Sequence, residues 1–377
     1  MAELRTFQAP TQLVFGPGAI ARLGDLAREL HLARMLIVTD PGVAKAGLAT
    51  RALDILARAG VEGVVFADVE PNPSLATAER ASALYLDSGC QALVAVGGGS
   101  PIDVAKAVGL RASNSEPLAA YIGIGKVTAP LPPLVTVPTT VGTGSEATAF
   151  AVLTDRAKHK KVVIGSPFLA PRWALLDPEL VLTLPAALVA STGLDALTHA
   201  IESVISVFAT PFSDGLALEA IHTIASNLRH AVRVAELESR AALLYASTMA
   251  GMAFSCARTG LVHGMAHPLG GYCDVPHGLA NAILLPYVLA FNAPACKPGL
   301  ARVAAAMGEP ATAEAAIEAV RRLSADVGIP RRLSEVGVTE AYLPQMAQDA
   351  FESGNAQDVN PRKPTLQEVL DLYRQAL

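Results

Sequence analysis

The sequence predicts an α/β N-terminal domain with a parallel sheet at residues 1–184, followed by an all-helical domain at 185–377. Three observations support this prediction. The chain has 377 residues, which is enough for two or three domains. Its first half alternates short apolar runs with helical stretches, and its second half consists of long segments rich in Ala and Leu.

The first half contains four apolar runs that are rich in β-branched residues and end in turn-forming residues. They predict strands at 35–40, 63–69, 92–100 and 131–140. The segments 46–60 and 76–89 between them have helical periodicity. Continuous apolar strands separated by helices of this length are typical of βαβ units in a parallel sheet that is covered on both faces.

The second half carries few strand signals. Long apolar-periodic segments predict helices at 184–206, 214–237 and 239–257. The change of pattern places the domain boundary within residues 177–185.

The composition is unusually apolar for a soluble protein. Hydrophobic residues make up 51 % of the chain and charged residues 17 %, against a usual charged share of about 25 %. No uninterrupted run approaches the roughly 20 apolar residues of a membrane-spanning helix, so we expect no membrane segment. A large core with buried subunit interfaces is the better explanation, and it predicts a homo-oligomer, a dimer or larger.

Charge and cysteine content exclude other classes. The net charge is −5 and no basic block occurs, which argues against a nucleic-acid partner. The first residues, "MAELRTFQ", are charged where a secretory signal would be apolar. The four cysteines, Cys90, Cys256, Cys273 and Cys296, form no CxxC pair. Reduced thiols in a cytoplasmic protein are the prediction.

Two glycine-rich loops follow predicted strands and could bind phosphate. In the first, the glycines 97–99 precede Ser100 as the expected helix cap and Pro101 in the first helical turn. Such a turn lets phosphate approach the free N–H groups of a helix, although a plain strand-to-helix turn has the same pattern. The second, at 136–146, is rich in Thr and Gly and suits pyrophosphate or nicotinamide, or is only a loop.

Asp40 ends the first predicted strand. A carboxylate at that place accepts hydrogen bonds from the adenine ribose and repels a 2′-phosphate, which favours NAD over NADP. The alternative interpretation is an Asp-Pro-Gly turn.

A polar stripe marks the helix predicted at 184–206. Asp195, His199, Glu202 and Ser206 are spaced by four, three and four residues, which places them on one face of an otherwise apolar helix. His263 and His267 repeat the four-residue spacing, and we expect the following glycines and Pro268 to form a bend that returns His277 to the same point. One carboxylate with two or three imidazoles suits Zn²⁺ or Fe²⁺.

The alternative is that each histidine is an ordinary core or surface residue. The remaining histidines lie in charged or amphipathic contexts and receive no role: His31, His159, His222 and His230.

Several motifs together resemble those of the iron-containing (group III) alcohol dehydrogenases. They are "PNP" (71–73), "GGGSPIDVAK" (97–106), "PTTVGTGSE" (138–146), "GLDALTHAIES" (193–203), "SDGLALEAI" (213–221) and the segment 260–286. The resemblance extends from residue 15 to about residue 290. It implies a Rossmann-like dinucleotide-binding domain followed by a helical metal-binding domain, an architecture shared with dehydroquinate synthase.

The resemblance also implies site residues. The metal ligands of the family fall on Asp195, His199, His263 and His277, whereas His267 lies near nicotinamide and substrate and is not a ligand. The NAD contacts fall on Asp40, Gly97, Gly98, Gly99, Ser100, Thr139, Thr140 and Lys161, and Asn72 belongs to the same cleft. The implied cofactors are NAD and Fe²⁺, with Zn²⁺ also compatible.

The implied function is a metal-dependent alcohol dehydrogenase or aldehyde reductase. A hydride passes between a small alcohol or diol and NAD, while the metal holds the alkoxide in the cleft between the domains. His267 is expected to relay the proton or to position the nicotinamide.

The sequence is also compatible with other functions. An oxidoreductase similar to glycerol dehydrogenase or maleylacetate reductase is the nearest alternative. A lyase similar to dehydroquinate synthase is disfavoured, because it would need cations to grip a polyanion. Between residues 190 and 290 the cations are Arg229, Arg233, Arg240 and Arg258, with no Lys. A non-enzymatic metal-binding protein would show no NAD-dependent turnover.

Overall fold

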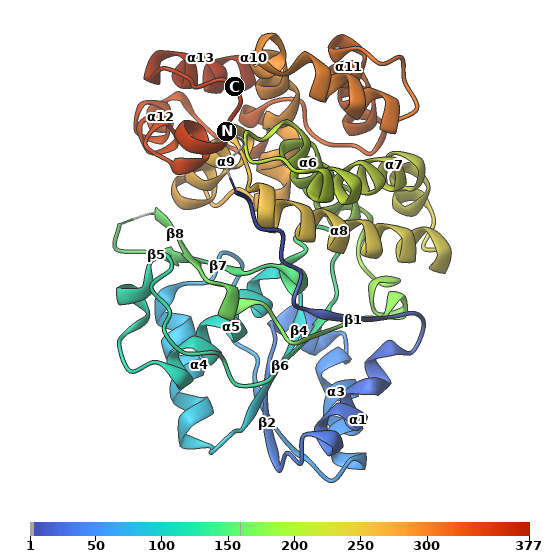
Figure 1. Cartoon of the computed structure of the whole chain (residues 1–377), viewed down its shortest axis with the longest axis vertical. Helices are drawn as coiled ribbons and strands as arrows, with labels where there is room; N and C mark the ends of the chain where they lie inside the picture. Colours follow the sequence, from blue (N-terminus) through green and yellow to red (C-terminus); the bar gives the residue numbers. More distant parts are fainter. Residues whose placement is uncertain (1–3, 159) are drawn as a thin grey trace. The chain divides into compact units, whose positions relative to one another are not determined.

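The structure is a computed structural model that describes residues 4–158 and 160–377, so His159 and the first three residues lie outside the description. Its contacts divide the chain into two units (Figure 1). The α/β unit consists of Pro10–Thr140 and Ser145–Leu184. The helical unit consists of Pro185–Leu377, the short segment Val141–Gly144 and the described residues 4–9. The chain therefore leaves the α/β unit once before residue 184, at residues 141–144 in the middle of the Thr/Gly-rich loop.

A six-stranded parallel sheet is the centre of the α/β unit. In spatial order its strands are β1 (Gln12–Phe15), β9 (Trp173–Leu176), β6 (Leu134–Pro138), β4 (Ala92–Gly97), β2 (Arg34–Val38) and β3 (Glu62–Phe66). Every neighbouring pair is parallel. Each of the four predicted strands overlaps a strand of this sheet.

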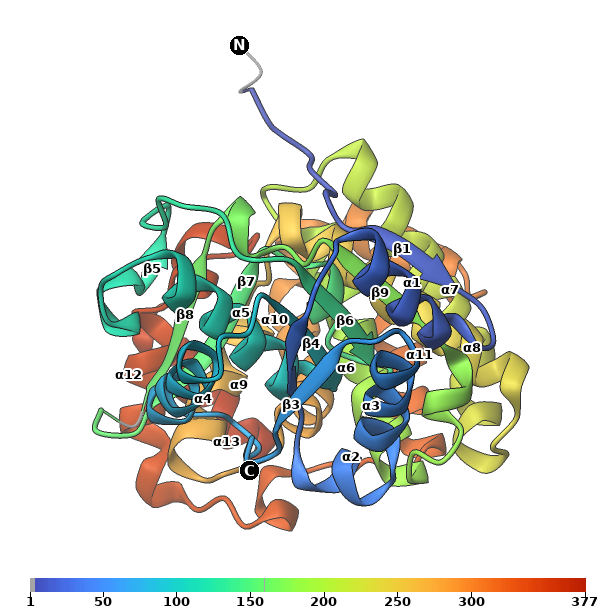
Figure 2. The ribbon, with the colours of Figure 1, turned by 90° about the horizontal axis from the view of Figure 1, so that it is seen from below.

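Helices cover both faces of this sheet (Figure 2). On one face, α1 (Arg22–Glu29) and α3 (Leu48–Arg58) pack on Met35, Ile37 and Val94. On the other, α4 (Leu75–Asp87) and α5 (Gly99–Ser113) pack on alternate residues of the same strands, such as Leu36 and Leu93. The predicted fold class is therefore confirmed.

A second sheet of three strands was not predicted. It consists of β5 (Gly123–Ile124), β8 (Lys160–Gly165) and β7 (Phe150–Asp155) in that order. The strands β7 and β8 are antiparallel, and Asp155 Oδ1 accepts hydrogen bonds from the N–H groups of Ala157 and Lys158 in the connection between them.

The helical unit is built around α6 (Ala186–Ile205), which packs against α7 (Pro211–Arg233), α8 (Leu237–Ala257) and α10 (His277–Ala306) (Figure 1). Nearly every residue of α6 beyond its first turn is buried, which explains its Ala/Leu-rich sequence. The remaining helices are α9 (Leu261–Tyr272), α11 (Ala313–Asp326), α12 (Leu343–Phe351) and α13 (Leu366–Ala376).

One described helix, α10, is long and apolar enough to cross a membrane by length and composition, with a mean hydropathy of 1.5 over 18 residues. A mean hydropathy over a window can be high even where polar residues interrupt the apolar runs of the helix. The backbone leaves the helical conformation at Cys296 (φ −138°, ψ 31°). Leu284, Leu285 and Val288 are fully buried in the fold, as in a core helix of a soluble protein.

Candidate metal centre and cofactor site

Two candidate ligands, Asp195 and His199, come from the buried helix α6. They are one turn apart on one face of the helix, and both side chains are buried. The first turn of α10 lies against this face. A Cβ atom at Gly278 would lie 2.7 Å from the carbonyl oxygen of Ser191. The lack of a side chain at Gly278 therefore lets α10 approach α6 closely.

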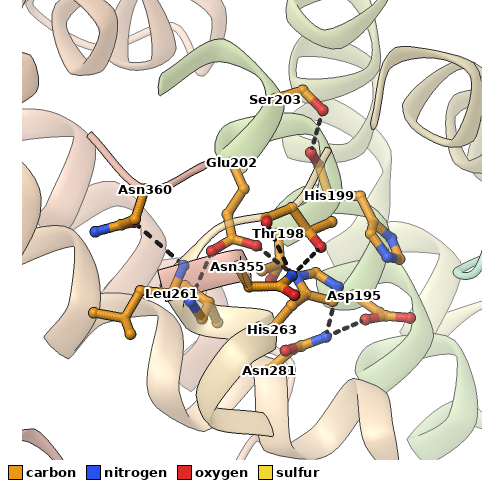
Figure 3. Close-up of polar contacts among 12 residues, drawn as sticks. Asp195, Thr198, His199, Glu202, Ser203, Leu261, His263, Asn281, Asn355 and Asn360 are labelled. Atoms are coloured by element: carbon orange, nitrogen blue, oxygen red, sulfur yellow. Dashed lines mark hydrogen bonds and ion pairs between the residues drawn. The ribbon is translucent and has the colours of Figure 1, made fainter. Parts of the chain in front are cut away.

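The other two candidate ligands, His263 and His277, come from α9 and α10. One ligand atom from each of Asp195, His199, His263 and His277 lies within 4.8 Å of all the others. The rings of His199 and His263 stack with centroids 4.5 Å apart, and Figure 3 shows both beside Asp195. The structure thus brings together four residues that are up to 82 positions apart in the chain.

The connection to His277 differs from the expected one. The helix α9 continues through Pro268 and the glycines and ends at Tyr272. The chain turns afterwards, where Asp274 adopts a left-handed backbone conformation (φ 52°) and Pro276 precedes α10. The predicted bend at the glycines and Pro268 is therefore wrong. The proline removes only one N–H donor, and packing of α9 against α10 and α12 holds the helix together across it.

The donor set fits a transition-metal ion. One carboxylate oxygen and three imidazole nitrogens are ligands that Fe²⁺ and Zn²⁺ accept. Burial lowers the pKa of His263 to about 3 and the pKa of His199 well below 6.5, so both rings are neutral, as ligands must be. The Nδ1 atom of His199 is buried without a hydrogen-bond partner among the described residues.

The carboxylates at the site are desolvated. Burial raises the pKa of Asp195 to about 7 and the pKa of Glu202 to about 8. A divalent cation among the four donors would oppose both shifts, because it stabilises nearby negative charge. The electrostatics of the site therefore match a cation.

Asn281 is a further residue of the site that the sequence reasoning missed. Its Nδ2 atom donates to Asp195 Oδ1 at 2.7 Å and lies 3.1 Å from His263 Nε2 (Figure 3). The same atom lies 3.2 Å from His277 Nε2. The sequence cue that could have identified Asn281 is its position four residues, or one helical turn, after His277.

The other two residues of the predicted polar stripe, Glu202 and Ser206, have different partners. Glu202 contacts His263 Nδ1 at 2.5 Å, on the side of the ligands. Ser206 instead donates to the carbonyl oxygen of Ala257 at the end of α8, away from the ligands.

His267 lies beside the four donors and outside the set. Its ring stacks on that of His277 with centroids 5.5 Å apart, and it is half-buried. A half-buried imidazole next to a buried site is suited to moving a proton.

Within the α/β unit, three neighbouring strands bring the predicted cofactor residues to one edge. Asp40 follows β2, the turn Gly97–Ser100 ends β4, and Thr139 and Thr140 follow β6. These strands are adjacent and parallel, so their carboxyl ends share an edge. Open α/β sheets bind nucleotides at such an edge.

The glycine-rich turn is shaped by close contacts. A Cβ atom at Gly97 would lie 2.5 Å from Pro101 Cγ, and one at Gly98 would lie 2.9 Å from Thr140 Cγ2. The N-cap of α5 is Gly98, so the expectation that Ser100 caps the helix is wrong. The helix begins two residues earlier than a cap at Ser100 implies, and a glycine cap has no side chain to satisfy the first N–H groups, which suits an anion.

The remaining predicted cofactor residues also have structural partners. Asp40 is the N-cap of α2 (Pro41–Lys45), and its Oδ1 accepts from Val43 N at 2.9 Å. Lys161 on β8 donates to Asn72 Oδ1 at 2.6 Å, so these two residues are brought together.

Lys106 is a buried cation that the sequence reasoning did not single out. Its Nζ atom donates to Ser145 Oγ, Thr148 Oγ1 and the carbonyl oxygen of Phe150 at 2.7–2.9 Å. Asp103, one turn earlier on α5, lies 3.8 Å away and accepts from Ser145 Oγ. Burial lowers the pKa of Lys106 to about 8. Lys106 and Asp103 together hold the segment 145–150 against α5.

Comparisons with known proteins cover nearly the whole chain. A family model described as "Iron-containing alcohol dehydrogenase" matches residues 10–178, and one described as "Fe-containing alcohol dehydrogenase family, C-terminal" matches residues 189–377. The chain is 44 % identical to a 1,3-propanediol dehydrogenase of Klebsiella pneumoniae, over 98 % of each chain. It is 37 % identical to an NAD-dependent methanol dehydrogenase of Bacillus methanolicus, over 99 % of this chain and 100 % of the relative. A crystal structure of a 1,3-propanediol oxidoreductase, 44 % identical, covers 100 % of both chains with a TM-score of 0.96.

Proposed function

The chain belongs to the iron-containing alcohol dehydrogenase family, and we propose that it interconverts a short alcohol or diol and the aldehyde with NAD and Fe²⁺. The observation that carries the proposal is the convergence of Asp195, His199, His263 and His277, which we assign as the metal ligands. Zn²⁺ suits the same donors. The family and the names of the relatives favour this function over a lyase or a non-enzymatic metal-binding protein.

The α/β unit would bind NAD through its sheet edge. The free N–H groups at the start of α5 are suited to the pyrophosphate, and Gly97 and Gly98 let it approach the backbone. One oxygen of Asp40 caps α2, and we assign the carboxylate to the ribose hydroxyls, where its charge disfavours a 2′-phosphate. Thr139, Thr140 and the Asn72–Lys161 pair complete the assigned cofactor contacts.

When bound, the metal supplies a Lewis acid for the substrate oxygen and NAD supplies the hydride acceptor. The residues of the chain then have two tasks. The four donors on α6, α9 and α10 would hold the ion, and His267 would take the hydroxyl proton towards solvent. The stacking of His267 on His277 holds its ring next to the donor set.

The substrate class is proposed from the relatives. They include a 1,3-propanediol dehydrogenase and an NAD-dependent methanol dehydrogenase, so short primary alcohols and diols come first. The direct test is NAD⁺ reduction by the iron-loaded protein with 1,3-propanediol, methanol, ethanol and 1,2-propanediol, with NADP⁺ as the cofactor control. No turnover with any of these alcohols would refute the proposal.

Substitutions separate metal binding from proton transfer. We expect His263→Ala and His277→Ala to lose metal and activity together. His267→Ala should keep its metal and lose about 10²–10⁴-fold in kcat, the usual contribution of a general acid or base. Metal analysis and steady-state kinetics provide the readouts, and His230→Ala, at an exposed histidine, is the control. Metal loss in His267→Ala with metal retained in His277→Ala would reverse the assignment.

We also propose a cytoplasmic homo-oligomer. The free state of all four cysteines is compatible with a reducing compartment. Strand β1 lies at an edge of the six-stranded sheet, and Phe15 within it is 70 % exposed. An apolar edge strand favours pairing with another chain. Light scattering of the purified protein tests this part, and a monomeric mass would contradict it.

A further inference from the structure

Glu202 is a buried carboxylate at the metal centre that is not one of its ligands. Its side chain is 1 % exposed, and it lies one turn after His199 on α6. A buried carboxylate is costly unless hydrogen bonds satisfy it. Its partners therefore indicate what it does (Figure 3).

The first partner is the start of α9. The N-cap of this helix is Gly260, which has no side chain to satisfy the first N–H groups. Two residues that are distant in the sequence do so instead. Glu202 Oε1 accepts from Val262 N at 2.7 Å, and Asn360 Oδ1 accepts from Leu261 N at 3.2 Å. A Cβ atom at Gly260 would lie 3.1 Å from Glu202 Oε1, so a glycine leaves room for the carboxylate.

The second partner is the imidazole of His263. Glu202 Oε2 lies 2.5 Å from Nδ1. At the other side of the ring, Nε2 lies 3.1 Å from Asn281 Nδ2, which also donates to Asp195 Oδ1. An ionised carboxylate can only accept, so the contact with Glu202 Oε2 places the ring proton on Nδ1 and leaves Nε2 unprotonated. The lone pair of Nε2 is thereby directed to the donor set.

We propose that Glu202 is the positioning residue of the metal centre: it fixes the tautomer and orientation of His263 and anchors the helix that carries it. This inference rests on the proposed metal ligands and not on the substrate. It predicts that metal affinity depends on a side chain that does not touch the metal, as with the outer partners of metal-bound histidines.

The variant that tests this is Glu202→Gln, which keeps the shape and removes the charge. An amide can offer its oxygen to only one of the two donors. When the oxygen accepts from Val262 N, its N–H₂ group faces Nδ1 and drives the proton of His263 to Nε2, towards the ligands. We expect affinity for Zn²⁺ and for Co²⁺ to fall about 10–100-fold.

The matched control is Asn360→Ala, which removes the other capping contact of α9 and does not touch His263. It should lower Tm and keep the metal affinity of the wild type. Chelator competition gives the affinity, the visible spectrum of the Co²⁺ form reports ligand geometry, and circular dichroism of the metal-free proteins checks the fold. Ser206→Ala, at the C-cap of α6, replaces the control if Asn360→Ala does not fold.

The outcomes distinguish the two proposals. A 10–100-fold loss in Glu202→Gln with a changed Co²⁺ spectrum, and no loss in the control, supports the positioning role. Wild-type affinity and spectrum in Glu202→Gln overturn it and leave Glu202 as a helix cap only. Wild-type protein that binds neither ion overturns this inference together with the proposed metal centre.

Discussion

Lys106 is a fully buried ammonium group in the α/β unit, within hydrogen-bonding distance of three oxygen atoms. Its partner Asp103 is also held by Ser145 Oγ and Val152 N. Burial of a charge disfavours the charged form, and the contacts offset this effect only in part, because the pKa of Lys106 is still lowered to about 8. The protein therefore keeps a titratable group with a shifted pKa inside the α/β unit.

This shift predicts a pH dependence of stability. In the unfolded chain Lys106 keeps its proton up to about pH 10.5, whereas in the folded protein it releases the proton near pH 8. Between these values the unfolded state binds more protons, so a rise in pH stabilises the folded state. We expect the free energy of unfolding of the wild type to rise between pH 8 and pH 10, relative to that of the Asp103→Asn/Lys106→Met variant.

The double variant is the reference because it contains neither titratable group. Urea unfolding at a series of pH values measures the difference, which should begin to rise only near pH 8. At acid pH the raised pKa of Asp103 makes the difference fall with rising pH instead. A difference that stays flat or falls above pH 8 would show that the ammonium group is not destabilised by burial.

At the scale of elements, the metal centre depends on how closely α10 approaches α6. The contact is made at Gly278, where an added Cβ atom would meet Ser191 O at 2.7 Å and Asp195 Cβ at 3.2 Å. Gly278 follows His277, so any displacement there moves a proposed ligand. The backbone of α6 is buried and cannot retreat easily.

We therefore expect Gly278→Ala to lower both metal affinity and stability, the latter by about 1–3 kcal/mol as in other overpacked cores. The matched control is Gly215→Ala on the exposed side of α7, where an added Cβ atom meets nothing within 4 Å. That change should be neutral or stabilising by about 0.4–1 kcal/mol. Metal titration and thermal unfolding measure both effects, and wild-type metal affinity in Gly278→Ala would contradict the role of this contact.

Elements with strong local patterns were predictable from the sequence. Strands β2, β4 and β6 are covered on both faces and so consist of continuous apolar runs. The four candidate ligands were identified from the spacing of Asp195 and His199 and from the family motifs.

Features that depend on partners distant in the sequence were not predictable. Strand β1 has four residues and is recognisable as a strand only by its pairing with β9, about 160 positions later. The cap of α5 was placed two residues late, because Ser100 has the residue type of a cap while the glycines set the geometry. The spacing of Asn281 and Glu202 from predicted ligands was visible in the sequence, but their partners follow from the packing of α6, α9 and α10.

At the scale of the whole molecule, the proposed ligands all belong to the helical unit. Metal binding to a folded site adds to the stability of the elements that carry the ligands. We expect a chelator to lower Tm and to reduce the hydrogen-exchange protection of α6, α9 and α10, while β2, β4 and β6 keep theirs. The control is His263→Ala, whose exchange pattern should not change with chelator. Equal loss of protection in both units of the wild type would contradict this prediction.

The segment Val141–Gly144 limits where this chain can be joined to a relative in a chimeric protein. Gly144 faces Gly251 on α8 so closely that a Cβ atom on either would lie within 2.9 Å of the other's backbone, and a Cβ atom at Gly142 would lie 2.6 Å from Thr192 O. These four residues belong to the helical unit, although in the sequence they lie between strands β6 and β7 of the α/β unit. A chimera joined at residue 184 would therefore combine a loop from one parent with helices from the other. Shuffled libraries should keep 141–144 and 185–377 from the same parent.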